Sequence, residues 1–319
     1  PQMTPLGALY SYNNAAFNVI GRVIEVITGK NYHAATQEML LEPMALNTSC
    51  FFGHDVMLHR FALGHNTQGD QVVIAKPWFE SRCDAPCGGL SSSAEEMLRY
   101  ARFHMGDGRT NSGAGLLAPE SLAQMQTPQL ASEDAEQIGL NWFICELDGV
   151  RICEHGGSSN GQQAGLWFAP SKQTAFTVLT NLDRGSRLID VLNQWVEENI
   201  LGVFRPQRQT RPLPADELTD FAGMYLFAAA GDLFSVTIAD GGLTLTHILQ
   251  NSGRADDGPF GIPRQAIPPF SFFSCGEDLF LGEDGAFKGS LFEFLRDPSG
   301  RVMWLRFGGR VFNKQISAE

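Results

Sequence analysis

The sequence predicts an α+β protein in two parts: helices with an antiparallel sheet, followed by a small antiparallel β-barrel. Three observations support this prediction. Apolar residues recur at helical spacing up to about Met125, and short apolar segments with turn residues between them begin near Gln137. Near the C-terminus, many short aromatic-rich segments are broken by Gly, Asp and Pro. The chain has 319 residues, about twice the ~150 of a typical domain, so two domains are expected.

Composition excludes several classes of protein. With 43% hydrophobic and 18% charged residues, the chain is neither disordered nor fibrous. No apolar run approaches the ~20 residues of a membrane-spanning helix, so no span is expected in this chain. A net charge of -12 repels phosphate backbones, which argues against a nucleic-acid partner. The six cysteines include no CxxC pair, which argues against a zinc ribbon or a thioredoxin-type redox site. No metal and no cofactor are predicted.

The first predicted helix covers residues 14–28 and ends at Gly29. Its expected buried stripe consists of Phe17, Ile20, Ile24 and Ile27. A second helix is expected over 33–41, before Pro43, and residues 48–90 are expected to be irregular.

Two further helices have clear start signals. Ser93 and Glu96 form a capping-box pattern that opens a helix running to about Met105. Pro119 suits the first turn of another short helix, because proline lacks the N–H that such a turn leaves unpaired.

An antiparallel meander is predicted next. Its strands are expected at 140–146, 150–154, 163–169 and 174–180. An amphipathic helix follows and is expected to pack across the sheet. The apolar face predicted for it carries Leu188, Val191, Leu192, Trp195 and Val196.

A change of composition marks the predicted domain boundary. Residues 203–215 hold three prolines and three arginines but no acid, which is typical of a linker. We therefore expect one domain over 1–202 and a barrel over 216–319. The linker arginines, Arg205, Arg208 and Arg211, are expected to be solvated rather than to bind an anion.

Two short motifs could carry chemistry, Tyr12-Asn13-Asn14 and His155-Gly156-Gly157-Ser158. Taken alone, the first also fits a helix N-cap beside a half-buried aromatic ring, and the second fits a turn after a strand. In the functional interpretation, paired glycines let a backbone approach a substrate, and an amide N–H there stabilises an oxyanion. A phenol can accept a proton where neighbouring cations lower its pKa from about 10.

Four blocks support the functional interpretation by their order along the chain. They are YNNAAFNVIGRVIEVITGKNY, LEPMALNTS, PCGGLSSSAEEMLRYARF and HGGSSNGQQAGLWFAPSKQTAFTVLTN. Over about residues 8–200 the chain closely resembles the serine β-lactamase and penicillin-binding-protein-like superfamily, in particular its esterases, D-aminopeptidases, carboxypeptidases and class C β-lactamases. This resemblance implies a β-lactamase/transpeptidase-like fold. Residues 216–319 are similar to the lipocalin-like barrel that follows this domain in some members.

The resemblance also implies roles for particular residues. Tyr12 corresponds to the Tyr of the Tyr-x-Asn motif, a general base and later a general acid, and Asn14 to the Asn that holds a substrate carbonyl or amide. His155, with Gly156 and Gly157, takes the place of Lys-Thr-Gly on the strand that edges the site, and Ser158 would supply an oxyanion-hole N–H. Because His replaces that Lys, β-lactam hydrolysis is not expected as the main activity.

The nucleophile of the family is a Ser-x-x-Lys upstream of Tyr-x-Asn, and no Ser in this chain has Lys three residues on. The resemblance therefore implies that the chain begins inside the hydrolase domain, with Ser and Lys on a missing upstream segment or a separate chain. The 319 residues alone are expected to be inactive.

The implied partners are a small ester, amide or peptide substrate and an N-terminal fragment, with oligomerisation left open. Relatives favour an extracytoplasmic location, and a non-catalytic binding protein is the alternative.

Overall fold

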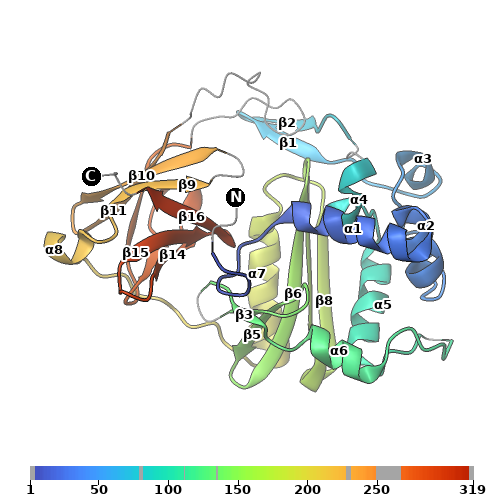
Figure 1. Cartoon of the computed structure of the whole chain (residues 1–319). Coiled ribbons are helices and arrows are strands. Elements are labelled where there is room, and N and C mark those ends of the chain that lie inside the picture. The colour runs from blue at the N-terminus through green and yellow to red at the C-terminus, as the bar shows by residue number, and fades with distance from the viewer. Residues whose placement is uncertain are drawn as a thin grey trace. The chain divides into compact units, whose positions relative to one another are not determined.

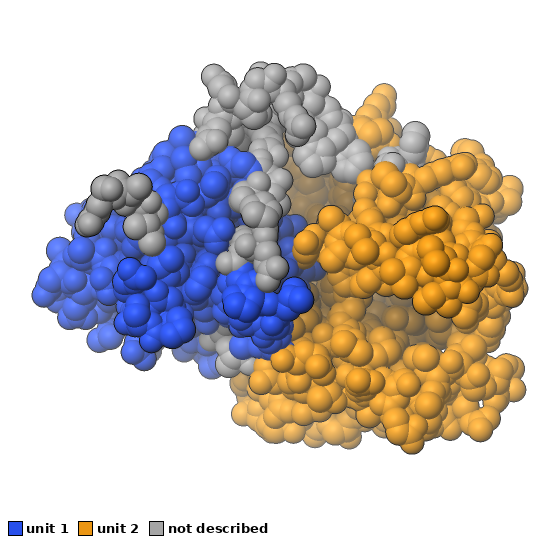
Figure 2. All heavy atoms as spheres, viewed as in Figure 1, with its two compact units in different colours: residues 1–12, 130–136, 206–319 blue, residues 13–129, 137–205 orange. Residues whose placement is uncertain are grey.

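A computed structural model describes residues 4–78, 82–110, 112–133, 136–227, 231–248 and 267–315. The chain divides into two compact units, coloured separately in Figure 2. Unit 1 comprises residues 1–12, 130–136 and 206–319, and unit 2 comprises residues 13–129 and 137–205. Each unit is described by itself. The domain limits inferred from composition stay a prediction.

Unit 2 contains helices where the sequence predicted them and short helices in the segment that was expected to be irregular. They are α1 (Asn14–Thr28), α2 (Tyr32–Thr36), α3 (Gly53–Val56), α4 (Ala85–Gly88), α5 (Ala94–Met105), α6 (Pro119–Met125) and α7 (Ser186–Val196). Two π-helical segments, η1 (Gln37–Leu41) and η4 (Glu197–Leu201), continue α2 and α7. The predicted helices over 14–28 and 94–105 are confirmed. The helix expected over 33–41 is α2 followed by η1.

Local sequence explains where α1 ends and where α5 begins. Gly29 ends α1 with φ of 67°, a left-handed conformation that glycine adopts without a steric penalty. The Ser93 hydroxyl accepts a hydrogen bond from the Glu96 N–H at the start of α5. Only half of the predicted capping box forms, because the Glu96 carboxylate instead accepts from the Thr48 N–H and the Ser49 hydroxyl.

The predicted meander is an antiparallel sheet in which each strand pairs with the next along the chain (Figure 1). Within unit 2 its strands are β4 (Gln137–Ile138), β5 (Phe143–Leu147), β6 (Val150–Ser159), β7 (Gln162–Ala169) and β8 (Thr174–Thr180). A separate hairpin, β1 (His65–Gln68) and β2 (Gln71–Ile74), lies in the segment expected to be irregular.

The sheet of unit 2 is covered on both faces, because alternate residues of a strand point to opposite sides. Trp167 belongs to a buried cluster with Val196, whereas the adjacent Phe168 packs with Ala101 of α5. A Cβ on Gly165 would lie 2.7 Å from Ile189, so a glycine at this position is what lets α7 approach β7 closely.

The buried faces of two helices differ from the prediction. On α1 the buried residue is Gly21, while Ile20 and Ile27 are 50% and 77% exposed. Among the described elements, α1 packs mainly on the short α4 and α2, which leave much of its surface exposed. On α7, Ile189 and Val196 are buried, whereas the predicted core residues Leu188, Val191 and Trp195 are more than half exposed. The helix packs on the sheet as predicted, but through a neighbouring stripe.

Arg205, in the segment predicted to be a linker, forms an ion pair. Its guanidinium donates to both carboxylate oxygens of Glu197, at 2.8 and 2.7 Å, and Glu197 is 1% exposed. Arg205 is therefore a partly exposed cation that pairs with a buried carboxylate and so anchors the chain that follows η4.

Unit 1 contains the predicted antiparallel barrel, which closes in the order β10-β11-β12-β13-β14-β15-β16-β9 (Figure 1). The strands are β9 (Gly223–Phe227), β10 (Asp232–Ala239), β11 (Gly242–Ile248), β12 (Phe270–Ser274), β13 (Leu279–Gly282), β14 (Leu291–Arg296), β15 (Val302–Phe307) and β16 (Arg310–Gln315). Also in unit 1 are α8 (Ala215–Leu218) and the short β3 (Leu130–Ala131). The barrel interior is filled by aromatic rings, among them Phe272, Phe280, Phe292 and Phe294.

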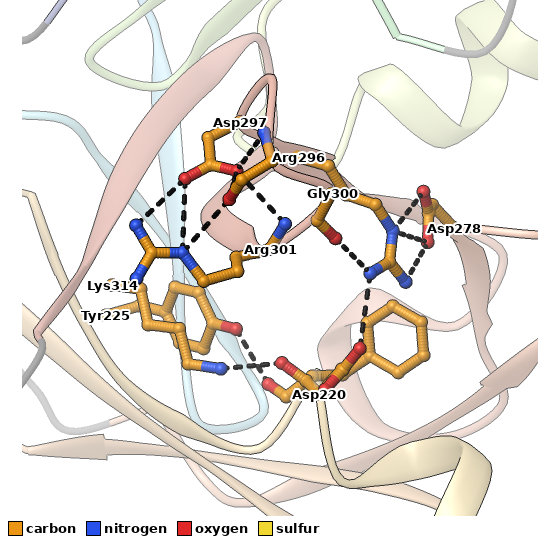
Figure 3. A network of polar contacts seen from close by, with 10 residues as sticks. Asp220, Tyr225, Asp278, Arg296, Asp297, Gly300, Arg301 and Lys314 are labelled. Atoms are coloured by element: carbon orange, nitrogen blue, oxygen red, sulfur yellow. Dashed lines mark hydrogen bonds and ion pairs between the residues drawn. The ribbon is translucent and has the colours of Figure 1, made fainter.

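Polar contacts tie the segment before β9 to the far strands of the barrel (Figure 3). The Arg296 guanidinium contacts both Asp278 and Asp220, and the Lys314 ammonium donates to the Asp220 carbonyl at 2.6 Å. The buried Tyr225 hydroxyl donates to the Phe221 carbonyl at 2.7 Å. The contact between Lys314 and Asp220 joins residues 94 positions apart and so helps to hold the closing strands together.

Candidate active site

The two motifs fall in different units. Tyr12 is the last residue of the first segment of unit 1, whereas Asn14, His155, Gly157 and Ser158 belong to unit 2. The roles expected for these five residues stay a prediction, and the surroundings of each are given within its own unit.

Tyr12 is half-buried and is held by the barrel of unit 1. Its N–H donates to the Gly309 carbonyl at 2.7 Å. The central carbon of the Arg310 guanidinium lies 5.3 Å from the centroid of the Tyr12 ring, which is cation–π geometry. The motif is thus more than the start of a helix, because its aromatic residue contacts a cation almost 300 positions away in the chain.

Asn14 is the first residue of α1, and Asn13 is its N-cap. This agrees with the structural interpretation of the motif as an N-cap beside a half-buried ring, although the Asn13 side chain makes no capping hydrogen bond. The side chain of Asn14 is exposed and makes no hydrogen bond to any other residue that the structure describes. It is therefore available to a ligand.

The His-Gly-Gly-Ser motif is part of β6 and not a turn, which corrects the structural interpretation. Pairing with β7 continues from His155↔Leu166 to Ser159↔Gln162, and the chain reverses only at Asn160 and Gly161. Pairing of β6 with β5 ends earlier, at Phe143↔Glu154. Residues 155–159, called here the β6 arm, therefore have a strand neighbour on one side only among the strands described for unit 2.

His155 is half-buried at the start of the β6 arm. Its ring lies 5.6 Å from the Phe143 ring, and burial lowers the pKa of its imidazole. His155 Nδ1 is 2.6 Å from the Gly156 carbonyl oxygen, which can only accept, so Nδ1 carries the proton. In this neutral tautomer Nε2 bears a lone pair and can accept a hydrogen bond from a substrate or a nucleophile.

Gly157 and Ser158 are both exposed on the β6 arm. A Cβ on Gly157 would meet only the Ala164 side chain, at 3.4 Å, so the backbone here is open to an approaching ligand. The Ser158 hydroxyl accepts a hydrogen bond from the Gln163 side-chain amide at 3.0 Å. Its side chain is thus tied to β7, which agrees with a role for the backbone of Ser158 rather than for its hydroxyl.

The tip of the β6 arm is fastened by residues that the motifs did not single out. The Asn160 side chain accepts from Asn66 of β1 at 2.7 Å and donates to the Pro77 carbonyl at 3.0 Å. The Asp183 carboxylate accepts from both the N–H and the hydroxyl of Thr67. The Ser-Asn-Gly sequence could have identified Asn160 as a turn residue. Its hydrogen-bond partners could not be predicted, because they come from the segment expected to be irregular.

Charged residues lie next to the β6 arm. Burial raises the pKa of Glu154 despite the nearby Arg205, whose guanidinium is 3.7 Å from the Glu154 carboxylate. Arg205 thereby anchors the strand one residue before His155. Among the described residues, no three His, Cys, Asp or Glu side chains are grouped to hold a metal ion. No described helix combines the length and apolar character needed to cross a bilayer.

Comparisons with known proteins identify what the chain resembles. The sequence model of the family described as Beta-lactamase matches residues 1–197. Penicillin-binding protein 4 of Amycolatopsis lactamdurans is 26% identical over 236 residues, which are 70% of this chain and 61% of that protein. This chain therefore spans about three fifths of the length of that relative.

Solved structures show the same fold. SurE aligns with 99% of this chain and 70% of its own, with a TM-score of 0.72 and 24% identity. A second SurE structure, with D-Leu, has a TM-score of 0.69 and 23% identity. The octameric penicillin-binding protein homologue from Pyrococcus abyssi covers 95% of this chain and 64% of its own, with a TM-score of 0.50 and 19% identity.

Proposed function

Since the chain belongs to the beta-lactamase family, we propose that it forms part of a serine hydrolase that cleaves ester or amide bonds through an acyl-enzyme. The observation that carries this proposal is the β6 arm, which presents a neutral His155 and two exposed glycines beside a strand edge. A backbone N–H at an exposed glycine can donate to the oxyanion that forms during attack, and the Nε2 lone pair of His155 can accept a proton or hydrogen bond from a substrate N–H or O–H.

In the proposed reaction a serine oxygen attacks the substrate carbonyl and gives its proton to the Tyr12 phenolate. Tyr12 then protonates the leaving alcohol or amine, so the acyl–oxygen or acyl–nitrogen bond breaks and an acyl-serine remains. Water releases the acid by the same route in reverse. Asn14 would hold the substrate carbonyl or amide, and the backbone at Gly157 and Ser158 would stabilise the oxyanion.

The serine and its lysine are proposed to come from polypeptide outside residues 1–319, either upstream in the same protein or on a separate chain. None of the serines of the chain has Lys three residues on. Large apolar side chains on α1 and α7, such as Val26, Ile27 and Val191, are each more than 60% exposed. Apolar faces of that kind are suited to packing against a further segment.

We propose a D-configured aminoacyl group as the first substrate class to test. The relatives that support it are SurE, which was determined with D-Leu, and the D-aminopeptidase branch that the motifs resemble. Because His155 stands where penicillin-recognising members carry Lys, this position has no permanent positive charge for a β-lactam carboxylate, so β-lactams are a secondary class to test.

The test uses protein captured from its native source through a tag at the C-terminus. Treatment with a fluorophosphonate, followed by peptide mass spectrometry, locates the reactive serine. The expected adduct is on the Ser of a Ser-x-x-Lys peptide outside residues 1–319. An adduct on a serine within this chain, or none at all, would overturn the proposal.

A non-catalytic binding protein is the second candidate, favoured by the absence of Ser-x-x-Lys from the sequence. The sequence of the parent gene separates the two candidates. An in-frame Ser-x-x-Lys upstream excludes the binding-protein candidate. If neither an upstream segment nor a co-purifying chain carries that motif, the hydrolase candidate is excluded.

A further inference from the structure

The turn between β15 and β16 approaches Tyr12 closely. Residues 308–310, called here the barrel turn, contain Gly308 and Gly309 with φ of 56° and 71°, which favour glycine. The Gly309 carbonyl accepts the Tyr12 N–H at 2.7 Å. A Cβ on Gly309 would lie 3.3 Å from the Tyr12 Cβ, whereas one on Gly308 would meet nothing within 4 Å. The backbone of Tyr12 thus rests against Gly309.

The third residue of the barrel turn contacts the ring of Tyr12. Arg310 is the first residue of β16 and pairs with Phe307, so the barrel fixes its backbone. Its guanidinium carbon is 5.3 Å from the Tyr12 ring centroid. A positive charge at that distance attracts the ring face and favours the phenolate over the neutral phenol.

Further contacts within unit 1 hold the barrel turn in place. The Gly309 N–H donates to the Glu133 carboxylate at 2.6 Å, and the Val311 N–H donates to the Ser11 hydroxyl at 3.2 Å. One strand earlier, the buried Arg306 is paired with Glu293 at 2.6 Å and donates to the Ala131 carbonyl. The barrel turn is therefore joined both to the segment that carries Tyr12 and to the segment around Glu133.

We propose that the barrel turn is a positioning element for Tyr12, in which Gly309 fixes the backbone and Arg310 orients the ring and favours the phenolate. This inference rests on the proposed function, in which Tyr12 transfers protons. It assigns the barrel turn a part in the proposed proton transfer, since Arg310 supplies the charge that prepares the general base.

The electrostatic part is tested by NMR titration of the 319-residue chain with ¹³C-labelled tyrosine. The chain has 5 tyrosines, and Tyr12→Phe identifies the resonance of Tyr12. Arg310→Met removes the charge and keeps much of the bulk, so the titration midpoint of Tyr12 should rise by about one pH unit. Arg310→Lys keeps the charge and should retain most of the wild-type midpoint. A midpoint that does not move in Arg310→Met would overturn this part.

The backbone part has a matched control within the barrel turn. Gly309→Ala and Gly308→Ala both place a methyl group at positive φ, but only the first presses on Tyr12. The Tyr12 ring resonance should shift in Gly309→Ala and stay in place in Gly308→Ala. Equal shifts in both variants would show a general distortion of the turn and overturn the assignment to Gly309.

These readouts are independent of the proposed chemistry. In the nucleophile-bearing protein, the pH–rate profile of Arg310→Met should move to higher pH, and Arg310→Lys should restore it in large part. If Tyr12→Phe leaves the rate unchanged, the proposed function fails, whatever the titration of Tyr12 shows. If Tyr12→Phe abolishes activity while Arg310→Met alters neither the midpoint nor the profile, only the positioning inference fails.

Discussion

The phenol of Tyr12 is the group whose removal tests the proposed chemistry most directly. Tyr12→Phe keeps the ring under Arg310 and removes only the oxygen, so the nucleophile-bearing protein should lose about 10²–10⁴ in kcat/KM for an activated ester. Tyr10→Phe is the matched control. Burial raises the pKa of Tyr10 to about 12, so it stays protonated and its loss should change kcat/KM little. Equal effects of the two substitutions would remove Tyr12 from the mechanism.

His104 makes the stability of the protein depend on pH. Its side chain is 3% exposed among Tyr100, Trp142 and Phe168, and burial lowers its pKa to about 4. Above the unfolded-state pKa of about 6.5, His104 is neutral in both the folded and the unfolded chain, so its titration does not reduce the free energy of unfolding. As the pH falls below 6.5 the unfolded chain binds a proton that the folded state excludes, so stability decreases toward pH 4.

The expected loss is about 2 kcal/mol in the free energy of unfolding between pH 7 and pH 5. Urea unfolding at the two pH values measures it, with His104→Phe as the comparison. The substitution should flatten the pH dependence. If wild type and variant lose the same amount, the buried imidazole is not its source.

At the scale of the element, Arg205 holds η4 and β6 together. Arg205→Met leaves the Glu197 carboxylate buried without its partner, which should cost about 3–5 kcal/mol in the free energy of unfolding. Arg151→Met is the control, because its pair with Glu146 is largely exposed and should contribute less than about 1 kcal/mol. Urea midpoints compare the two variants. Adding Glu197→Gln should recover part of the first loss, and equal losses in both single variants would contradict the anchor.

Elements were predictable where a local pattern specifies them. Helix α5 follows from its capping signal and apolar spacing, and β8 from a short apolar run after a turn. The length of β6 was not predictable, because paired glycines after a strand also fit a turn, and only pairing with β7 extends the strand to Ser159. Likewise, the amphipathic pattern of α7 identified a helix but not which stripe of it would be buried.

At the scale of the whole molecule, the 319-residue chain by itself should show no turnover. It has the residues proposed for proton transfer and oxyanion binding but no Ser-x-x-Lys. A burst assay with an activated ester should therefore give no acyl-enzyme, and a polypeptide that carries the Ser-x-x-Lys segment should restore the burst when added. Hydrolysis by the purified chain, lost in Tyr12→Phe, would show that the nucleophile lies within these residues.

The sequence by itself determined the kinds and order of the elements and, through its ordered motifs, the family. Helices, strands and motifs depend on residues close together in the chain, so the spacing of residues in the sequence is enough to predict them. Only the tertiary structure decided that Tyr12 is held by a barrel turn almost 300 residues away and that Arg205 pairs with the buried Glu197. It also decided that residues 155–159 pair with β7 alone among the strands described for unit 2. Each of these depends on contacts between segments distant in the chain, and local periodicity carries no information about such contacts.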